Sequence, residues 1–232
     1  PATFFIASGY QQGGCMWNDR IIEALRMCTS EELDLREVGL GTVKLDSMEN
    51  RRSAVDDLLN QIKHREPEDR ARSVETVVAA TGAGPPPTLM MNDEQVRSLI
   101  RRGMEVGAHT VSHPILTRLD SSAAGAEIRE SKAQLEQLTG HAVRLFAYPN
   151  GVPKSDYAAE HVQMVRDAGF DAAVSTAWGA ASVGDDLYQL PRFTPWDRTR
   201  LRRAAGLESQ PQSVRGRLKA FPLRLPVHWR NQ

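Results

Sequence analysis

The sequence lacks the marks of a membrane-spanning or disulfide-rich protein. No run approaches the roughly 20 apolar residues that cross a bilayer, and no charged-then-apolar leader is present. The two cysteines, Cys15 and Cys28, have no C-x-x-C spacing, so we expect buried or incidental thiols rather than a disulfide framework or a thiolate metal site. With 41% apolar and 25% charged residues among 232, the composition is that of one large globular domain.

The chain also has no net formal charge, but its charges are distributed unevenly. From Arg198 to the end, nine Lys or Arg residues stand against one acid, Glu208. A basic end of this kind is more often solvated than bound to an anionic surface, so a nucleic-acid partner has little support. We expect a domain over residues 1–206 and a basic tail over residues 207–232.

The sequence also lacks the polar N-terminal residues with which most domains begin. The first residues, Pro1-Ala2-Thr3-Phe4-Phe5-Ile6-Ala7-Ser8, are already apolar and β-forming. We therefore expect the sequence to open in mid-strand, without its native N-terminus. Targeting signals would then lie outside it. We expect the bacterial cytoplasm or the cell envelope, and no oligomeric state is predicted.

Helical and β-rich segments alternate along the chain. Apolar residues at helical spacing, with capping or stop signals, predict helices after Asn18 and Asp19, after Ser47, from Pro67, after Asn92, over 121–138 and before Gly169. Strands are expected at 1–8, 104–108, 143–148, 170–175 and 188–193, and 33–44 is expected to be irregular. This alternation predicts a parallel α/β sheet or barrel with a helical insertion at about 20–88. Active residues are expected where the strands end.

Two histidines lie four residues apart after the central strand. The run from Gly103 to Ala108 is apolar and β-like, and His109 and His113 follow it. One helical turn would bring two such imidazoles about 5–6 Å apart at Cβ, close enough to share an ion. The strand-end position favours metal binding over surface or core histidines. A hydrolytic zinc ion takes three protein ligands and a water, so a third ligand is required.

Three segments stand in a fixed order: the opening Pro1-Ala2-Thr3-Phe4-Phe5, then His109-Thr110-x-x-His113-Pro114, then Phe146-x-Tyr148-Pro149-x-Gly151. In this order they resemble the polysaccharide deacetylase family, carbohydrate esterase family four, with its NodB-type homology domain. The resemblance covers about residues 1–8 and 103–197. It implies a distorted (β/α) barrel of that family's type, incomplete at the N-terminus and carrying the helical insertion.

The resemblance also implies a function. The family's H-[ST]-x-x-H segment supplies two metal ligands, which carries over onto His109 and His113. Its R-x-P-[YF] segment gives a backbone N–H to the oxyanion, a catalytic role that would fall on Tyr148. We expect a hydrolase that uses Zn²⁺ or another divalent ion to remove N-acetyl groups from an amino-sugar polysaccharide or oligosaccharide.

Aromatic and basic residues at the expected rim are candidates for substrate binding. Because sugar rings stack on aromatic faces, we expect Trp17, Trp178 and Trp196 to line the groove, with core packing as the alternative for each. Arg192 is expected to hydrogen-bond the substrate or to form a structural ion pair.

The chain departs from the family pattern in ways that leave the function open. The first motif, T-F-D-D-G, which supplies the catalytic base and third metal ligand, is absent, as are the arginine of the third motif and the late L-x-H that supplies the acid. His161 and His228 fit structural roles better. Asp19, Asp120 and Asp185 are weak candidates for a replacement ligand. The alternatives are a non-catalytic carbohydrate-binding or scaffold domain of the same fold, and an unrelated barrel metallohydrolase.

Overall fold

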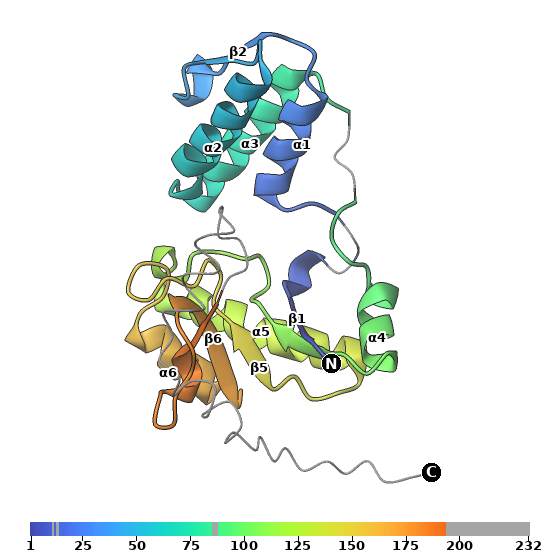
Figure 1. The fold of residues 1–232 in the computed structure, drawn as a ribbon, viewed down its shortest axis with the longest axis vertical. Coiled ribbons are helices and arrows are strands. Elements are labelled where there is room, and N and C mark those ends of the chain that lie inside the picture. The colour runs from blue at the N-terminus through green and yellow to red at the C-terminus, as the bar shows by residue number, and fades with distance from the viewer. Residues whose placement is uncertain (11, 13, 85–87, 194–232) are drawn as a thin grey trace, which may run out of the picture.

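A five-stranded parallel sheet organises one half of the molecule (Figure 1). The structure, a computed structural model, describes residues 1–10, 12, 14–84 and 88–193. The strands are β1 (Thr3–Ile6), β4 (Glu105–Ala108), β5 (Leu145–Ala147), β6 (Ala172–Trp178) and β7 (Leu190–Arg192), and they neighbour one another in chain order. All their carboxyl ends therefore meet at one rim of the sheet.

Three helices pack on this sheet and complete what we call the sheet body. They are α4 (Asp93–Arg101), α5 (Ser121–Thr139) and α6 (Ala159–Asp167). The capping box predicted at Asn92 is present, with Asn92 and Gln95 bonding each other's backbone N–H groups at 2.9 Å. The core between helices and sheet includes Val106, Ile128, Leu135, Phe146, Val165 and Phe170, all buried.

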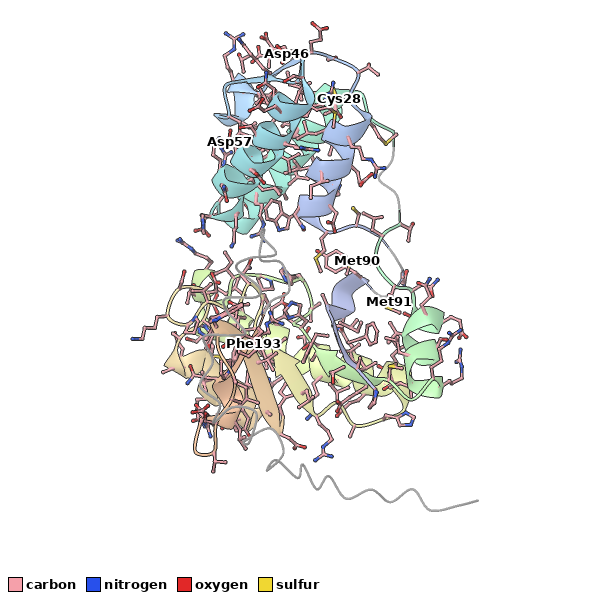
Figure 2. All side chains as sticks on the ribbon, viewed as in Figure 1. Cys28, Asp46, Asp57, Met90, Met91 and Phe193 are labelled. Carbon is pink, nitrogen blue, oxygen red and sulfur yellow. The ribbon has the colours of Figure 1, made fainter. Side chains whose placement is uncertain are left out.

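The helical stretch between β1 and β4 has a core of its own. The helical body, residues 17–81, contains α1 (Trp17–Met27), α2 (Met48–Lys63), α3 (Pro67–Thr81), β2 (Glu32–Asp34) and β3 (Thr42–Lys44). Its buried residues include Ile21, Leu25, Leu35, Leu58, Ile62 and Val77. Figure 2 shows Cys28, Asp46 and Asp57 on this body and Phe193 on the sheet body.

Two antiparallel segments connect the bodies. Gln12 pairs with Asn92, and the carbonyl of Gly14 accepts from Leu89 N–H at 2.8 Å and from Met90 N–H at 3.1 Å. Figure 2 places Met90 on this connection. These backbone hydrogen bonds tie the two segments to each other where they run between the bodies.

Most predicted elements are present, and two expectations need correction. The stretch expected to be irregular, 33–44, contains the antiparallel pair β2–β3, with the left-handed Gly39 at the turn between them. The expected barrel is present as an open sheet, whose edges among the described residues are β1 and β7. The tail over 207–232 lies outside the described residues, and no helix among those described is long and apolar enough to cross a membrane.

Candidate functional site

The two histidines lie side by side at the rim of the sheet. His109 directly follows β4, and its N–H still donates to the Ile6 carbonyl at 3.0 Å. The ring centroids of His109 and His113 are 4.7 Å apart, with the ring planes at 70°. Free imidazoles in this arrangement can present nitrogen lone pairs to a common point.

Hydrogen bonding fixes which nitrogen of His109 is available. Nδ1 lies 2.7 Å from the carbonyl oxygen of Ala147, at the end of β5. A carbonyl only accepts, so Nδ1 carries the proton and Nε2 presents its lone pair. Burial of the ring, with a smaller contribution from His113, lowers the pKa of His109 to about 3. The side chain is therefore held neutral, the form that binds a metal ion.

The loop between the histidines is strained and internally bonded. Thr110 and His113 have positive φ angles of 66° and 58°, a conformation that β-branched threonine rarely adopts. The Thr110 hydroxyl donates to the His109 carbonyl and accepts from the His113 N–H at 3.1 Å. This one side chain therefore connects the two ends of the loop.

The carboxylate of Glu127 on α5 is hydrogen-bonded to the same loop. It accepts from the N–H of Val111 at 2.7 Å and from the N–H and hydroxyl of Ser112 at 2.9 and 2.6 Å. On the other side, Gly9 N–H donates to the Val111 carbonyl at 2.8 Å. A Cβ at position 9 would lie 2.8 Å from that carbonyl oxygen, so the close approach requires glycine.

A pocket of about 170 Å³ lies between the helical body and the rim. We call it the rim pocket. Its lining residues come from both bodies: Trp17, Asn18, Leu59, Asn60, Lys63, Arg70, His113, Ile115 and Asn150. Burial lowers the pKa of His113, and the charges of Lys63 and Arg70 lower it further, against an opposing effect of Glu127. The pocket is therefore polar, cationic and open to one of the two histidines.

The role predicted for Tyr148 disagrees with the structure. Its N–H donates to the Val174 carbonyl at 3.2 Å, so this amide is already engaged in the sheet. Its side chain is buried, stacks on Tyr157 with centroids 3.8 Å apart, and donates its hydroxyl to the Tyr188 carbonyl at 2.9 Å. Burial raises the pKa of Tyr148. Tyr148 is a core residue, and its amide is not the oxyanion donor we expected.

Asn150 takes the position that we had assigned to Tyr148. In the R-x-P-[YF] pattern the last residue follows the proline, and after Pro149 that residue is Asn150. Asn150 has a φ of 58° and lines the rim pocket. Its carbonyl accepts from the Thr176 hydroxyl at 3.0 Å, while its N–H finds no acceptor among the residues described. Aligning the motif on Pro149 would have identified it.

The four predicted substrate-binding residues are scattered. Trp17 lines the rim pocket, with the Cζ of Arg70 5.8 Å from its ring centroid. Arg192 lies close enough to His109 for its charge to lower the pKa of that histidine, and its Nε has no partner in the described part of the chain. Trp178 is 54% exposed and packs edge-on against Phe193, away from the pocket lining. Trp196 lies outside the described residues.

Among the described residues, the two histidines are the candidate ligands for a zinc-type ion, and no third ligand lies beside them. Within residues 1–10, 12, 14–84 and 88–193, no group of three His, Cys, Asp or Glu side chains could hold a metal. Two of the three aspartates considered from the sequence bond nearby backbone: Asp120 caps α5 by accepting from Ala123 N–H at 2.8 Å, and Asp185 accepts from Ser182 N–H at 2.6 Å. The third, Asp19, accepts from the side-chain amide of Asn18 at 3.3 Å.

Comparison with known proteins matches one segment of this chain to a known family. Residues 75–173, which include both histidines, match the family model described as polysaccharide deacetylase. The protein YxkH of Bacillus subtilis (strain 168), assigned to the polysaccharide deacetylases, is 26% identical over 102 residues, covering 44% of this chain and 35% of YxkH. This chain thus spans about a third of the length of that relative. Residues 75–173 carry a polysaccharide deacetylase family domain.

Two solved structures illustrate the range of proteins with a partly similar fold. The Streptococcus pyogenes deacetylase PplD, in complex with acetate, is 25% identical with a TM-score of 0.42, covering 48% of this chain and 46% of PplD. BA3943, a CE4 family pseudoenzyme from Bacillus anthracis, is 15% identical with a TM-score of 0.33, covering 75% of this chain and 46% of BA3943. Both TM-scores are below 0.5, so neither structure carries a functional inference for this chain.

Proposed function

We propose that this protein is a metal-dependent hydrolase that removes N-acetyl groups from an amino-sugar polysaccharide or oligosaccharide. One observation carries the proposal: His109 and His113 lie with ring centroids 4.7 Å apart at the rim, inside the family-matched region. The hydrogen bond from His109 Nδ1 to Ala147 supports it, because it leaves Nε2 for a metal ion. We also propose that the open sheet is part of a distorted barrel.

The histidines would hold zinc or a similar divalent ion. Such an ion, when bound, polarises the acetamide carbonyl and lowers the pKa of a coordinated water toward about 7. Their lowered pKa values keep both imidazoles neutral and ready to coordinate. Glu127 and Thr110 act as positioning residues, because they hold the loop that carries both rings.

Other residues at the rim would bind and orient the sugar. The Asn150 N–H is the candidate donor to the oxyanion, a type of interaction whose loss elsewhere costs about 3–4 kcal/mol. Trp17, which lines the rim pocket, would contact the sugar beside it. Arg192, near His109, would hydrogen-bond the substrate, and Trp178 and Trp196 remain proposed groove residues.

The second candidate is a non-catalytic carbohydrate-binding or scaffold domain of the same fold. It is favoured by the absence of a third metal ligand beside the histidines among the described residues, and by the lack of an acidic side chain in the lining of the rim pocket. A pocket without a carboxylate has no side chain of the kind that takes the proton of an attacking water.

Acetate release decides between these candidates. The wild-type protein, His109→Ala and the control His141→Ala would each be incubated with acetylated chito-oligosaccharides and zinc. The control removes an exposed histidine that follows α5. Release that needs His109 but not His141 supports the hydrolase. Binding of the oligosaccharide without acetate release supports the non-catalytic domain.

A further inference from the structure

Among the described residues that line the rim pocket, two are cations and none is an acid. Lys63 is the last residue of α2 and Arg70 lies in the first turn of α3, and both line the rim pocket together with His113. The other lining residues are neutral, and three of them carry side-chain amides: Asn18, Asn60 and Asn150. Asp19, the acid next to Asn18, is outside the lining, and its carboxylate accepts from the Asn18 amide at 3.3 Å.

Neither cation is neutralised by the protein as described. None of the ion pairs among the described residues includes Lys63 or Arg70, although eight other basic residues are paired. Arg70 is half-buried, and its guanidinium lies over the Trp17 ring, 5.8 Å from the centroid. Burying part of a charge without an opposite charge is unfavourable, so this arrangement is suited to an anion that binds there.

The proposed metal site also favours an anion in this pocket. A divalent cation held by His113 would be repelled by the two positive charges in the lining of the same pocket, because like charges repel strongly at a partly buried site. An anionic group seated between the cations and the ion would offset this repulsion.

We propose that the rim pocket binds the carboxylate or phosphate group of an acidic sugar. This sugar lies next to the acetamido group that the site hydrolyses. Lys63 and Arg70 bind the charged oxygens, and the amides of Asn18 and Asn60 bond the hydroxyls of the ring that carries them. The inference rests on the proposed function and narrows its substrate class to acidic amino-sugar glycans. The helical body would then provide substrate specificity.

Matched neutral and acidic ligands test the proposal by NMR-monitored titration of the full chain. One arm compares N-acetylglucosamine joined to glucuronic acid with the neutral N-acetylglucosamine dimer. The other compares N-acetylglucosamine 1-phosphate with N-acetylglucosamine. We expect binding about tenfold tighter for the acidic member of at least one pair, and the arm that shows it identifies carboxylate or phosphate.

The variants Lys63→Gln and Arg70→Gln, combined, should reduce that preference to less than twofold. The control combines Lys44→Gln with Arg52→Gln, two exposed cations of the helical body away from the pocket, and should leave it unchanged. If the double variant does not fold, the wild-type preference should still fall severalfold between about 50 and 300 mM salt. Equal binding within both pairs, or a preference that survives in the folded double variant, overturns the proposal.

A separate assay keeps the two proposals apart. If neutral and acidic oligosaccharides bind equally and release acetate at equal rates, the hydrolase proposal stands and the proposal that the pocket binds an anion is wrong. If the acidic ligand binds selectively through Lys63 and Arg70 but no acetate is released, the pocket is an anion-binding site. The hydrolase proposal is then wrong, and the substrate assignment that rests on it is wrong as well.

Discussion

Glu127 accepts two hydrogen bonds from Ser112, from its N–H at 2.9 Å and its hydroxyl at 2.6 Å. It also accepts from the neighbouring Val111 N–H at 2.7 Å. These bonds attach the loop that carries both histidines to α5, a helix whose buried face packs in the core of the sheet body. The positions of the two imidazoles therefore depend on a side chain that does not line the pocket.

Replacing Glu127 should loosen this loop. We expect Glu127→Ala to lower the free energy of unfolding by about 1–3 kcal/mol, because three donors lose a charged acceptor, and to weaken zinc binding about tenfold or more. Urea unfolding and a zinc titration measure the two effects. The matched control is Glu130→Ala, an exposed acid on the same helix. Equal behaviour of the two variants would mean that Glu127 does not position the loop.

Gly151 should tolerate alanine poorly. It has a φ of 75°, and an added Cβ would lie 3.0 Å from the Tyr148 carbonyl oxygen and 3.1 Å from two atoms of Thr176. Gly140 has a similar φ of 69° but open space around it. We expect Gly140→Ala to cost about 1 kcal/mol and Gly151→Ala about 2–3 kcal/mol, because crowding adds to backbone strain. Equal costs in urea unfolding would show that the rim turn relaxes.

Tyr148→Phe separates a core residue from a catalytic one. Removing the hydroxyl deprives the Tyr188 carbonyl of its donor at 2.9 Å, so the free energy of unfolding should fall by about 1 kcal/mol. Acetate release should stay within about twofold of wild type, because the Tyr148 side chain does not line the rim pocket. A large drop in kcat with unchanged stability would give Tyr148 a direct role in the reaction.

His161 should make the stability depend on pH. It is buried on α6, and its Nδ1 accepts from the Ala158 N–H at 2.9 Å, so the neutral ring is favoured and burial lowers its pKa. A histidine whose folded pKa lies below its unfolded value of about 6.5 stabilises the fold fully above that pH. This contribution is lost as the pH falls toward the folded pKa.

The comparison of wild type with His161→Gln isolates this effect. Glutamine keeps an acceptor for the Ala158 N–H but does not titrate. We expect the stability advantage of wild type over the variant to shrink between about pH 7.5 and 5 in urea unfolding. Parallel pH curves for the two proteins would contradict the assignment, and His141→Gln controls for the loss of an exposed histidine.

Sequence patterns predicted the elements whose signals are local. The Asn92 box, the glycine after Thr139 and the apolar strand before His109 depend on neighbouring residues, and the structure has all three. The hairpin β2–β3 was missed because its strands have three residues each, too short for a period to be recognised.

The parts of the site that were missed depend on distant contacts. Lys63 and Arg70 belong to helices whose apolar spacing reveals the buried face but not which end meets the rim. Glu127 reads as an ordinary surface acid on α5 until the fold brings it to Ser112, 15 residues earlier. Tyr148 was misjudged because a strand-end position does not tell whether its amide is already bonded to a neighbouring strand.

A zinc titration tests most directly whether His109 and His113 form a metal site. Isothermal titration of zinc into the protein, and into His109→Ala and His113→Ala, should show one-to-one binding that each substitution weakens at least about tenfold, since each removes one of the two imidazoles. The control His141→Ala should bind as wild type does. Zinc binding that is unchanged in both His109→Ala and His113→Ala would contradict the assignment of this pair as the metal site.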